Sequence, residues 1–177
     1  SKAAQYELLI RQVQEIPFQI CKMAAKQGHV AAQLDLANRY YEGKEVEQSY
    51  KEAFRWYNSA AHLADTVAQY KLASMYIEGR GFDKKMKELA VMWYKIAAKN
   101  NYPPAQCELG KLYEQGEVDG GKNLREAQKL YTKSVTQGYS EGYFRLAEIQ
   151  LVQGKIQLAI KNYESALAES YKPAAKK

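Results

Sequence analysis

A short pattern of residues returns along this chain about every 36 positions, and this periodicity limits the possible folds more than any other feature. The pattern pairs alanine with glutamine and continues to a leucine, a small residue, a tyrosine and a glycine; it starts at Ala32, Ala68 and Ala105. Repeats of this length are typical of solenoids, in which each unit buries its apolar face only against its neighbours. The sequence therefore predicts an array of stacked units, for which binding is a more natural function than catalysis.

A second pattern keeps the same interval and indicates that the units are helical. Ala53, Trp56, Tyr57, Ala60 and Ala61 recur at a helical spacing, which places them on one face of an α-helix. Each unit is therefore expected to contain a helix A, which carries the leucine, and a helix B, which carries the aromatic pair, packed antiparallel. The predicted helices span residues 3–14, 17–27, 30–42, 49–63, 66–78, 86–99, 103–115, 123–137, 140–153 and 155–169.

The small residue after the helix-A leucine marks the place where the two helices of a unit approach each other most closely. The other units carry alanine there, whereas the unit that starts at Pro103 carries Gly110. A glycine inside a helix costs about 1 kcal/mol relative to alanine. We therefore expect Gly110 to allow a close contact that a larger side chain would block.

The composition is that of a folded protein without a strongly charged surface. Of the 177 residues, 46% are hydrophobic and 26% are charged, which excludes wholesale disorder. The net charge of +6 is scattered apart from Lys84, Lys85, Lys87 and the last two lysines, and solvated helix faces account for it. No apolar run reaches the ~18 residues that a membrane span needs, and the first residues lack a signal-peptide pattern. We expect no membrane insertion and favour the cytoplasm.

Residues able to perform catalysis or bind a metal are sparse and scattered. His29 and His62 have no histidine, cysteine or carboxylate partner at ligand spacing. Cys21 and Cys107 lie in different units and are interpreted as reduced packing residues. The glycines at 79–81 lack the preceding strand and the Lys-Ser/Thr pair of a phosphate loop. The sequence predicts no catalytic residue, no metal and no cofactor.

Two stretches carry a family resemblance. Residues 109–116 read Leu-Gly-Lys-Leu-Tyr-Glu-Gln-Gly, and residues 93–98 read Trp-Tyr-Lys-Ile-Ala-Ala. Together with an apolar loop residue, which is Val46, Phe82 or Val118, they resemble the Sel1-like repeat, a relative of the tetratricopeptide repeat. The resemblance implies an all-α fold, an α–α superhelix in which antiparallel helix pairs form a right-handed solenoid.

The resemblance covers about residues 17–175 and divides one solenoid domain into unequal parts. The connection after Gly154 is short, which makes the fourth unit more similar to a tetratricopeptide repeat. The expected parts are a degenerate repeat or cap at 1–29, Sel1-like repeats at 30–65, 66–102 and 103–139, a tetratricopeptide-like repeat at 140–172, and the start of a further, truncated helix at 173–177.

The resemblance also implies where a partner would bind. In tetratricopeptide arrays the concave face is lined by the helix-A positions two before, two after and five after the leucine. The corresponding residues form the candidate surface, which comprises Leu34, Asn38, Tyr41, Tyr70, Ser74, Ile77, Lys111, Glu114, Phe144, Glu148 and Leu151. Apolar side chains with a polar rim favour a protein or peptide partner. The alternative for Leu34, Tyr70 and Phe144 is that they only seal adjacent repeats.

The sequence thus predicts a non-enzymatic scaffold or adaptor that binds a protein or peptide on its concave face. Two alternatives stay open: a regulatory or targeting segment of a larger enzyme and, less favoured, an RNA-binding solenoid. A surface that binds the phosphates of a nucleic acid needs a continuous stripe of positively charged side chains. Because Glu114 and Glu148 share the candidate surface with Lys111, a nucleic-acid partner is not expected.

Overall fold

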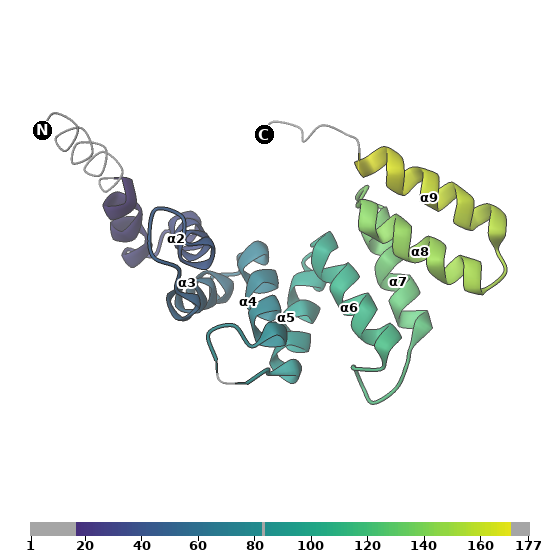
Figure 1. The fold of residues 1–177 in the computed structure, drawn as a ribbon, viewed down its shortest axis with the longest axis horizontal. Coiled ribbons are helices and arrows are strands. Elements are labelled where there is room, and N and C mark those ends of the chain that lie inside the picture. The colour runs from purple at the N-terminus through teal and green to yellow at the C-terminus, as the bar shows by residue number, and fades with distance from the viewer. Residues whose placement is uncertain (1–16, 83, 171–177) are drawn as a thin grey trace, which may run out of the picture. The chain divides into compact units, whose positions relative to one another are not determined.

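The computed structural model of the chain describes residues 17–82 and 84–170, and the regular structure of these residues is helical (Figure 1). The expectation of an all-α fold is confirmed. Contacts divide the chain into two compact units, one ending at Ala90 and the other starting at Val91. Helices that follow one another in sequence pack against each other over residues 30–78 of the first unit and over residues 103–170 of the second.

The helices alternate between the A and B types that the periodicity predicts. A helical stretch over residues 17–26 comes first. It is followed by α2 (Val30–Glu42), α3 (Tyr50–His62), α4 (Thr66–Glu78), α5 (Lys87–Lys99), α6 (Pro103–Gln115), α7 (Leu124–Val135), α8 (Ser140–Val152) and α9 (Ile156–Ser170). The bounds of α2, α4 and α6 are those predicted, and the other ends differ by about one or two residues. The helix predicted at 3–14 and the truncated helix at 173–177 lie outside the described residues.

Local sequence signals set the helix ends. The side chains of Ser49, Asp65 and Asn123 each accept a hydrogen bond from a backbone N–H of the first helical turn, which caps α3, α4 and α7. Helix α4 ends at Gly79, whose φ of 73° lies in the left-handed region and whose N–H donates to the Met75 carbonyl. Because a residue with a Cβ atom rarely adopts this φ, the glycine that closes the helix-A pattern has a conformational role.

The repeated apolar residues form the core. Leu36, Leu72 and Leu109 of the A helices are at most 4% exposed, and Tyr57 and Tyr131 of the B helices are fully buried. Helix α2 packs on α3, and α6 packs on α7, so in these two repeats the leucine-bearing helix contacts the tyrosine-bearing helix. Removing these side chains from water is the main stabilising contribution, and a single helix could not achieve it alone.

The glutamine of each Ala-Gln pattern forms a hydrogen bond with the preceding repeat. The side-chain Nε2 atoms of Gln33, Gln69 and Gln106 donate to backbone carbonyls at 3.1, 3.2 and 3.2 Å. The acceptors are the carbonyl oxygens of Ala25, Ala61 and Ala98. Each acceptor lies in the last turn of the preceding helix, where carbonyl groups lack a partner four residues on. These bonds fix the angle at which each helix A follows the preceding helix B.

Gln106→Leu is expected to lower the free energy of unfolding by about 1 kcal/mol. Gln106 is fully buried, and its loss would leave the Ala98 carbonyl with only the backbone N–H of Asn101 as a donor. Denaturant unfolding followed by circular dichroism would measure the change. Gln115→Leu, at the exposed end of the same helix, is the control and should change stability by less than about 0.5 kcal/mol. Equal effects of the two substitutions would contradict a role for the Gln106 amide.

Candidate functional site

The candidate surface falls into two groups, one in each compact unit. The first group lies on α2 and α4, and the second lies on α6 and α8. Because the positions repeat around the leucine at helical spacing, the members on each helix share one side of it. Most of these residues are half-buried, whereas Phe144 and Leu151 are 39% and 50% exposed.

Two candidate residues on α2 make contacts within the protein. Asn38 Oδ1 accepts a hydrogen bond from the hydroxyl of Tyr57 on α3 at 2.6 Å. The Tyr41 ring meets Tyr50 edge-on with 5.3 Å between ring centroids, and the Arg80 guanidinium lies 5.2 Å from both centroids. Arg80 also donates to the Tyr41 hydroxyl. Burial raises the pKa of Tyr41, so this hydroxyl stays protonated. Tyr41 therefore contributes to packing between α2, α3 and the loop after α4.

The rest of the first group is half-buried. Leu34 lies on α2, and Tyr70, Ser74 and Ile77 lie on α4. The Ser74 hydroxyl donates to the Tyr70 carbonyl at 3.1 Å, a bond within the helix. In this unit the candidate surface thus presents mainly apolar side chains, without a carboxylate or an amine among its members.

The second group is mostly charged. Lys111 pairs with Glu108 at 2.6 Å, and Glu148 pairs with Arg145 at 3.1 Å. Arg145 is shared, because its Nε atom also lies 2.8 Å from Glu141. These side chains are partly exposed, so each ion pair contributes little to stability. Among the members of the second group, two side chains are acidic, Glu114 and Glu148, and one is basic, Lys111. The net charge of the whole chain is nevertheless +6.

Glu114 is held by the buried tyrosine of helix B. The hydroxyl of Tyr131, which is fully buried, donates to Glu114 Oε2 at 2.7 Å. Burial, together with this hydrogen bond, raises the pKa of Tyr131, so the tyrosine remains the donor. Tyr57, at the same position of the α2–α3 repeat, donates to Asn38 instead. The same tyrosine position therefore contacts a different member of the candidate surface in each unit.

A cavity of about 260 Å³ opens beside the second group. This acidic pocket is lined by Glu114, Leu124, Glu148, Ile149, Val152 and Gln153. Only Glu114 and Glu148 belong to the candidate surface, and sequence reasoning missed the other lining residues. The signal that could have found them is the short connection after α8. In the earlier repeats a longer loop with an apolar residue follows helix A, but here α9 begins at Ile156 and Val152 remains 83% exposed.

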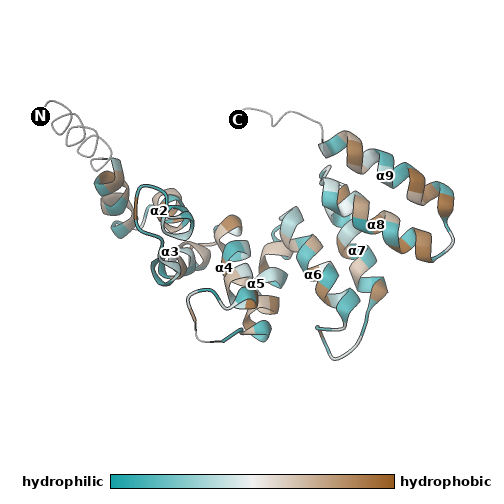
Figure 2. Cartoon of the chain, viewed as in Figure 1, coloured by the Kyte–Doolittle hydropathy of each residue, from teal (hydrophilic) through white to brown (hydrophobic). Residues whose placement is uncertain are grey.

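The acidic pocket combines apolar walls with two carboxylates. Such a lining suits a side chain that is apolar along its stem and cationic at its tip, because carboxylates form strong hydrogen bonds with ammonium and guanidinium groups. Hydrophobic residues lie at the end of α8 and at the start of α9, on either side of a polar connection (Figure 2). Leu151, Ile156 and Leu158 are each at least 50% exposed in this region. Exposed apolar side chains therefore lie close to the two carboxylates of the acidic pocket.

The cysteine and histidine side chains are the candidates for a nucleophile or a metal ligand, and their surroundings do not favour either role. Burial raises the pKa of the Cys21 and Cys107 thiols to about 11, which leaves both protonated and weakly nucleophilic at neutral pH. Both cysteines are free. The Nδ1 atom of His62 lies 2.7 Å from the Asn58 carbonyl. Across residues 17–82 and 84–170, no cluster of histidine, cysteine and carboxylate side chains is arranged to hold a metal ion. None of the helices described there has the length and apolarity that a bilayer crossing requires.

The family model of the Sel1 repeat matches the chain three times, at residues 30–65, 66–102 and 103–139, which together make up more than half of it. The chain belongs to the Sel1 repeat family. Sel1 repeat proteins are generally scaffolds for protein–protein interaction and are typically not catalytic. A comparison with curated proteins gave no match.

Solved Sel1 repeat structures are similar to this chain. A Sel1 repeat protein from Oxalobacter formigenes is 29% identical with a TM-score of 0.73, and the match covers 79% of this chain and 58% of that one. The protein c5321, a protective antigen present in uropathogenic Escherichia coli strains, is 30% identical with a TM-score of 0.78, covering 88% of this chain and 33% of that one. The chain thus spans 58% and 33% of the lengths of these two structures.

MamA resembles the chain in fold alone, at 20% identity and a TM-score of 0.55, with 86% of each chain covered. The Sel1 repeat structures confirm the solenoid fold that the sequence predicts.

Proposed function

We propose that this chain is a non-enzymatic Sel1 repeat scaffold that captures a protein or peptide partner on the candidate surface. The observation that carries the proposal is the acidic pocket, in which Glu114 and Glu148 of that surface meet apolar walls. Membership of a family of interaction scaffolds favours binding over catalysis. The two groups of the candidate surface act as separate contact regions, one mainly apolar and the other acidic.

The partner that fits the second group carries a lysine or arginine beside an apolar residue. The basic tip would meet Glu114 and Glu148, and Arg145 offsets Glu148 only partly because it is shared with Glu141. The apolar neighbour would pack on Leu151, which is 50% exposed in the free protein. Apolar anchors that lose their water on binding supply most of the affinity at protein interfaces.

Glu148→Gln combined with Leu151→Ala is expected to weaken partner binding at least tenfold, because each substitution removes about 1 kcal/mol of contact energy. The partner would be identified by affinity capture and mass spectrometry from cells that produce the protein, and its affinity measured by isothermal titration calorimetry. Both side chains are at least partly exposed, so helicity should not change. Raising the salt concentration should weaken wild-type binding more than binding by the double variant.

The matched control is Glu164→Gln combined with Leu89→Ala. Glu164 and Leu89 are exposed on B helices and lie outside the candidate surface. This control should bind the partner with wild-type affinity. If the first variant kept its full affinity, or if both double variants lost the same affinity, the proposed surface would be wrong.

A further inference from the structure

Three aromatic rings close the space between α3, α4 and the loop that follows α4. This ring cluster consists of Phe54, Tyr76 and Phe82. Phe82 of the loop is stacked on Tyr76 with 5.1 Å between ring centroids and 8° between the ring planes. Phe54 meets Phe82 edge-on at 4.4 Å and Tyr76 edge-on at 5.6 Å. The loop phenyl group therefore fills a slot whose walls are the face of one ring and the edge of another.

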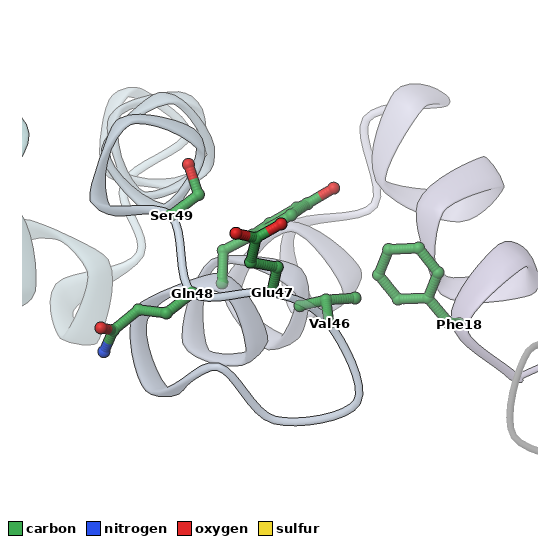
Figure 3. Close-up of a pocket in the computed structure, with 6 residues that line it drawn as sticks. Phe18, Val46, Glu47, Gln48 and Ser49 are labelled. Atoms are coloured by element: carbon green, nitrogen blue, oxygen red, sulfur yellow. The ribbon is translucent and has the colours of Figure 1, made fainter.

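The repeat before it has the same slot without the loop ring. The residues 36 positions earlier are Phe18, Tyr40 and Val46. Phe18 meets Tyr40 edge-on at 6.2 Å and 80°, close to the 5.6 Å and 76° of Phe54 and Tyr76. Valine replaces the phenyl group of Phe82, and among residues 17–82 and 84–170 no ring stacks on Tyr40 as Phe82 stacks on Tyr76. Figure 3 shows Phe18 on the first helix facing Val46 of the loop.

A pocket of about 510 Å³ opens at this place. The loop pocket is lined by Phe18, Tyr40, Val46, Glu47, Gln48 and Ser49 (Figure 3). Its volume lies within the range of small-ligand sites, roughly 300–1,000 Å³. None of these residues belongs to the candidate surface, so the loop pocket is a separate site.

The loop that forms this pocket is anchored in the same way as the filled one. The Ser49 N–H donates to the Tyr40 carbonyl at 2.9 Å, and the Met86 N–H donates to the Tyr76 carbonyl at 2.9 Å. Gln48 Nε2 also donates to the Tyr41 carbonyl at 2.9 Å, which holds the loop against α2. The walls of the slot are therefore preorganised, and a ligand need not order them on binding.

Valine in the loop does not by itself create a pocket. Val118 holds the same loop position in the α6–α7 repeat and is only 3% exposed, whereas Val46 is partly exposed. The two repeats also differ in the ring walls, because Val91 stands where Phe18 and Phe54 stand in the other repeats. Within the described ranges 17–82 and 84–170, two aromatic walls and a small loop residue occur together only around Val46.

We propose that the loop pocket binds an aromatic side chain of a peptide ligand, which stacks on Tyr40 as Phe82 stacks on Tyr76. The chain itself supplies the template, since the same two walls one repeat later hold a phenyl ring. An aromatic ring gains from both walls, because rings prefer stacked and edge-on neighbours. An aliphatic side chain would fill part of the space without these ring contacts.

The test is an NMR titration of the isotope-labelled full chain with N-acetyl-phenylalaninamide and, in parallel, N-acetyl-leucinamide. The aromatic amide should shift the Val46 methyl signals and the Ser49 backbone amide, and it should bind about threefold to tenfold more tightly than the leucine amide. No shifts at these residues, or equal affinities of the two amides, would overturn the proposal. Two other outcomes would also overturn it. If Val46 contacted residues 1–16 in the free protein, the chain itself would fill the loop pocket. If signals shifted with protein concentration in the absence of either amide, a second copy of the chain would fill it.

Val46→Phe should reproduce the filled slot and abolish the shift that the aromatic amide causes at the Ser49 backbone amide, without lowering the melting temperature. Its matched control is Val118→Phe, which overpacks a buried site and should lower the melting temperature by several degrees. Tyr40→Leu is a second variant, which keeps an apolar wall but removes the aromatic face on which a ring can stack. This variant should bind the aromatic amide and the leucine amide with about equal affinity. Unchanged aromatic binding by Val46→Phe, or by Tyr40→Leu if the first variant does not fold, would overturn the proposal.

Discussion

Gly110→Leu is expected to lower the free energy of unfolding by about 3 kcal/mol or more. A Cβ atom at Gly110 would lie 2.5 Å from Cε1 and 2.9 Å from Cζ of Tyr131. The tyrosine ring cannot move aside easily, because it is fully buried and its hydroxyl is bonded to Glu114. Leucine would therefore push α6 away from α7. The gain in helix propensity, about 1 kcal/mol, offsets only part of this cost.

Thermal unfolding followed by circular dichroism would show the effect of Gly110→Leu as a loss of roughly 6–12 °C in melting temperature. Gly121→Leu is the matched control. No atom lies within 4 Å of a Cβ placed at Gly121, so its melting temperature should stay close to that of the wild type. An unchanged melting curve for Gly110→Leu would show that α6 and α7 do not pack in the register described.

Gly142→Ala is expected to destabilise the protein by about 2 kcal/mol, although alanine normally favours a helix. A Cβ atom at Gly142 would lie 1.9 Å from the Oγ atom of Ser134 on α7. Ser134 is fully buried and donates to the Tyr131 carbonyl at 2.8 Å, so its hydroxyl cannot rotate away without losing that bond. The glycine on α8 therefore makes room for the serine hydroxyl on α7.

Ser134→Ala should rescue Gly142→Ala. In the preceding junctions the equivalent positions hold alanine on both helices, namely Ala60 with Ala68 and Ala97 with Ala105, all fully buried. The double variant should be at least as stable as the wild type, because it removes the clash and replaces a helical glycine. A double-mutant cycle from denaturant unfolding would measure a coupling of about 2 kcal/mol. Additive effects would contradict a direct contact between the two positions.

The sequence predicted most of the fold because the repeat specifies which face of each helix is buried. The stripe through Ala53 and Tyr57 located α3, and the small residue at 110 indicated a close approach before its partner, Tyr131, was known. The hydrogen bond from Gln106 to the Ala98 carbonyl was not predicted, because periodicity identifies a face but not the group that a side chain reaches.

The candidate site was less predictable because it depends on contacts between elements. Asn38 and Glu114 were placed on the candidate surface by their position along helix A, but the structure shows that each accepts a hydrogen bond from a buried tyrosine. The acidic pocket depends on where the connection after α8 turns, and the loop pocket depends on the replacement of one ring by Val46 between two aromatic walls. Both pockets are spaces that the surrounding side chains leave unfilled. A repeated sequence pattern does not show where such spaces remain.

Site-specific photo-crosslinking in cells that produce the protein would test the central claim most directly. A photoreactive phenylalanine would replace Ser74 or Lys111 of the candidate surface and, as controls, the exposed helix-B residues Lys51 or Lys133. If the helix-A residues bind the partner, both positions 74 and 111 should give a protein adduct on illumination, and positions 51 and 133 should give none. Adducts at the helix-B positions with none at 74 and 111 would contradict the account.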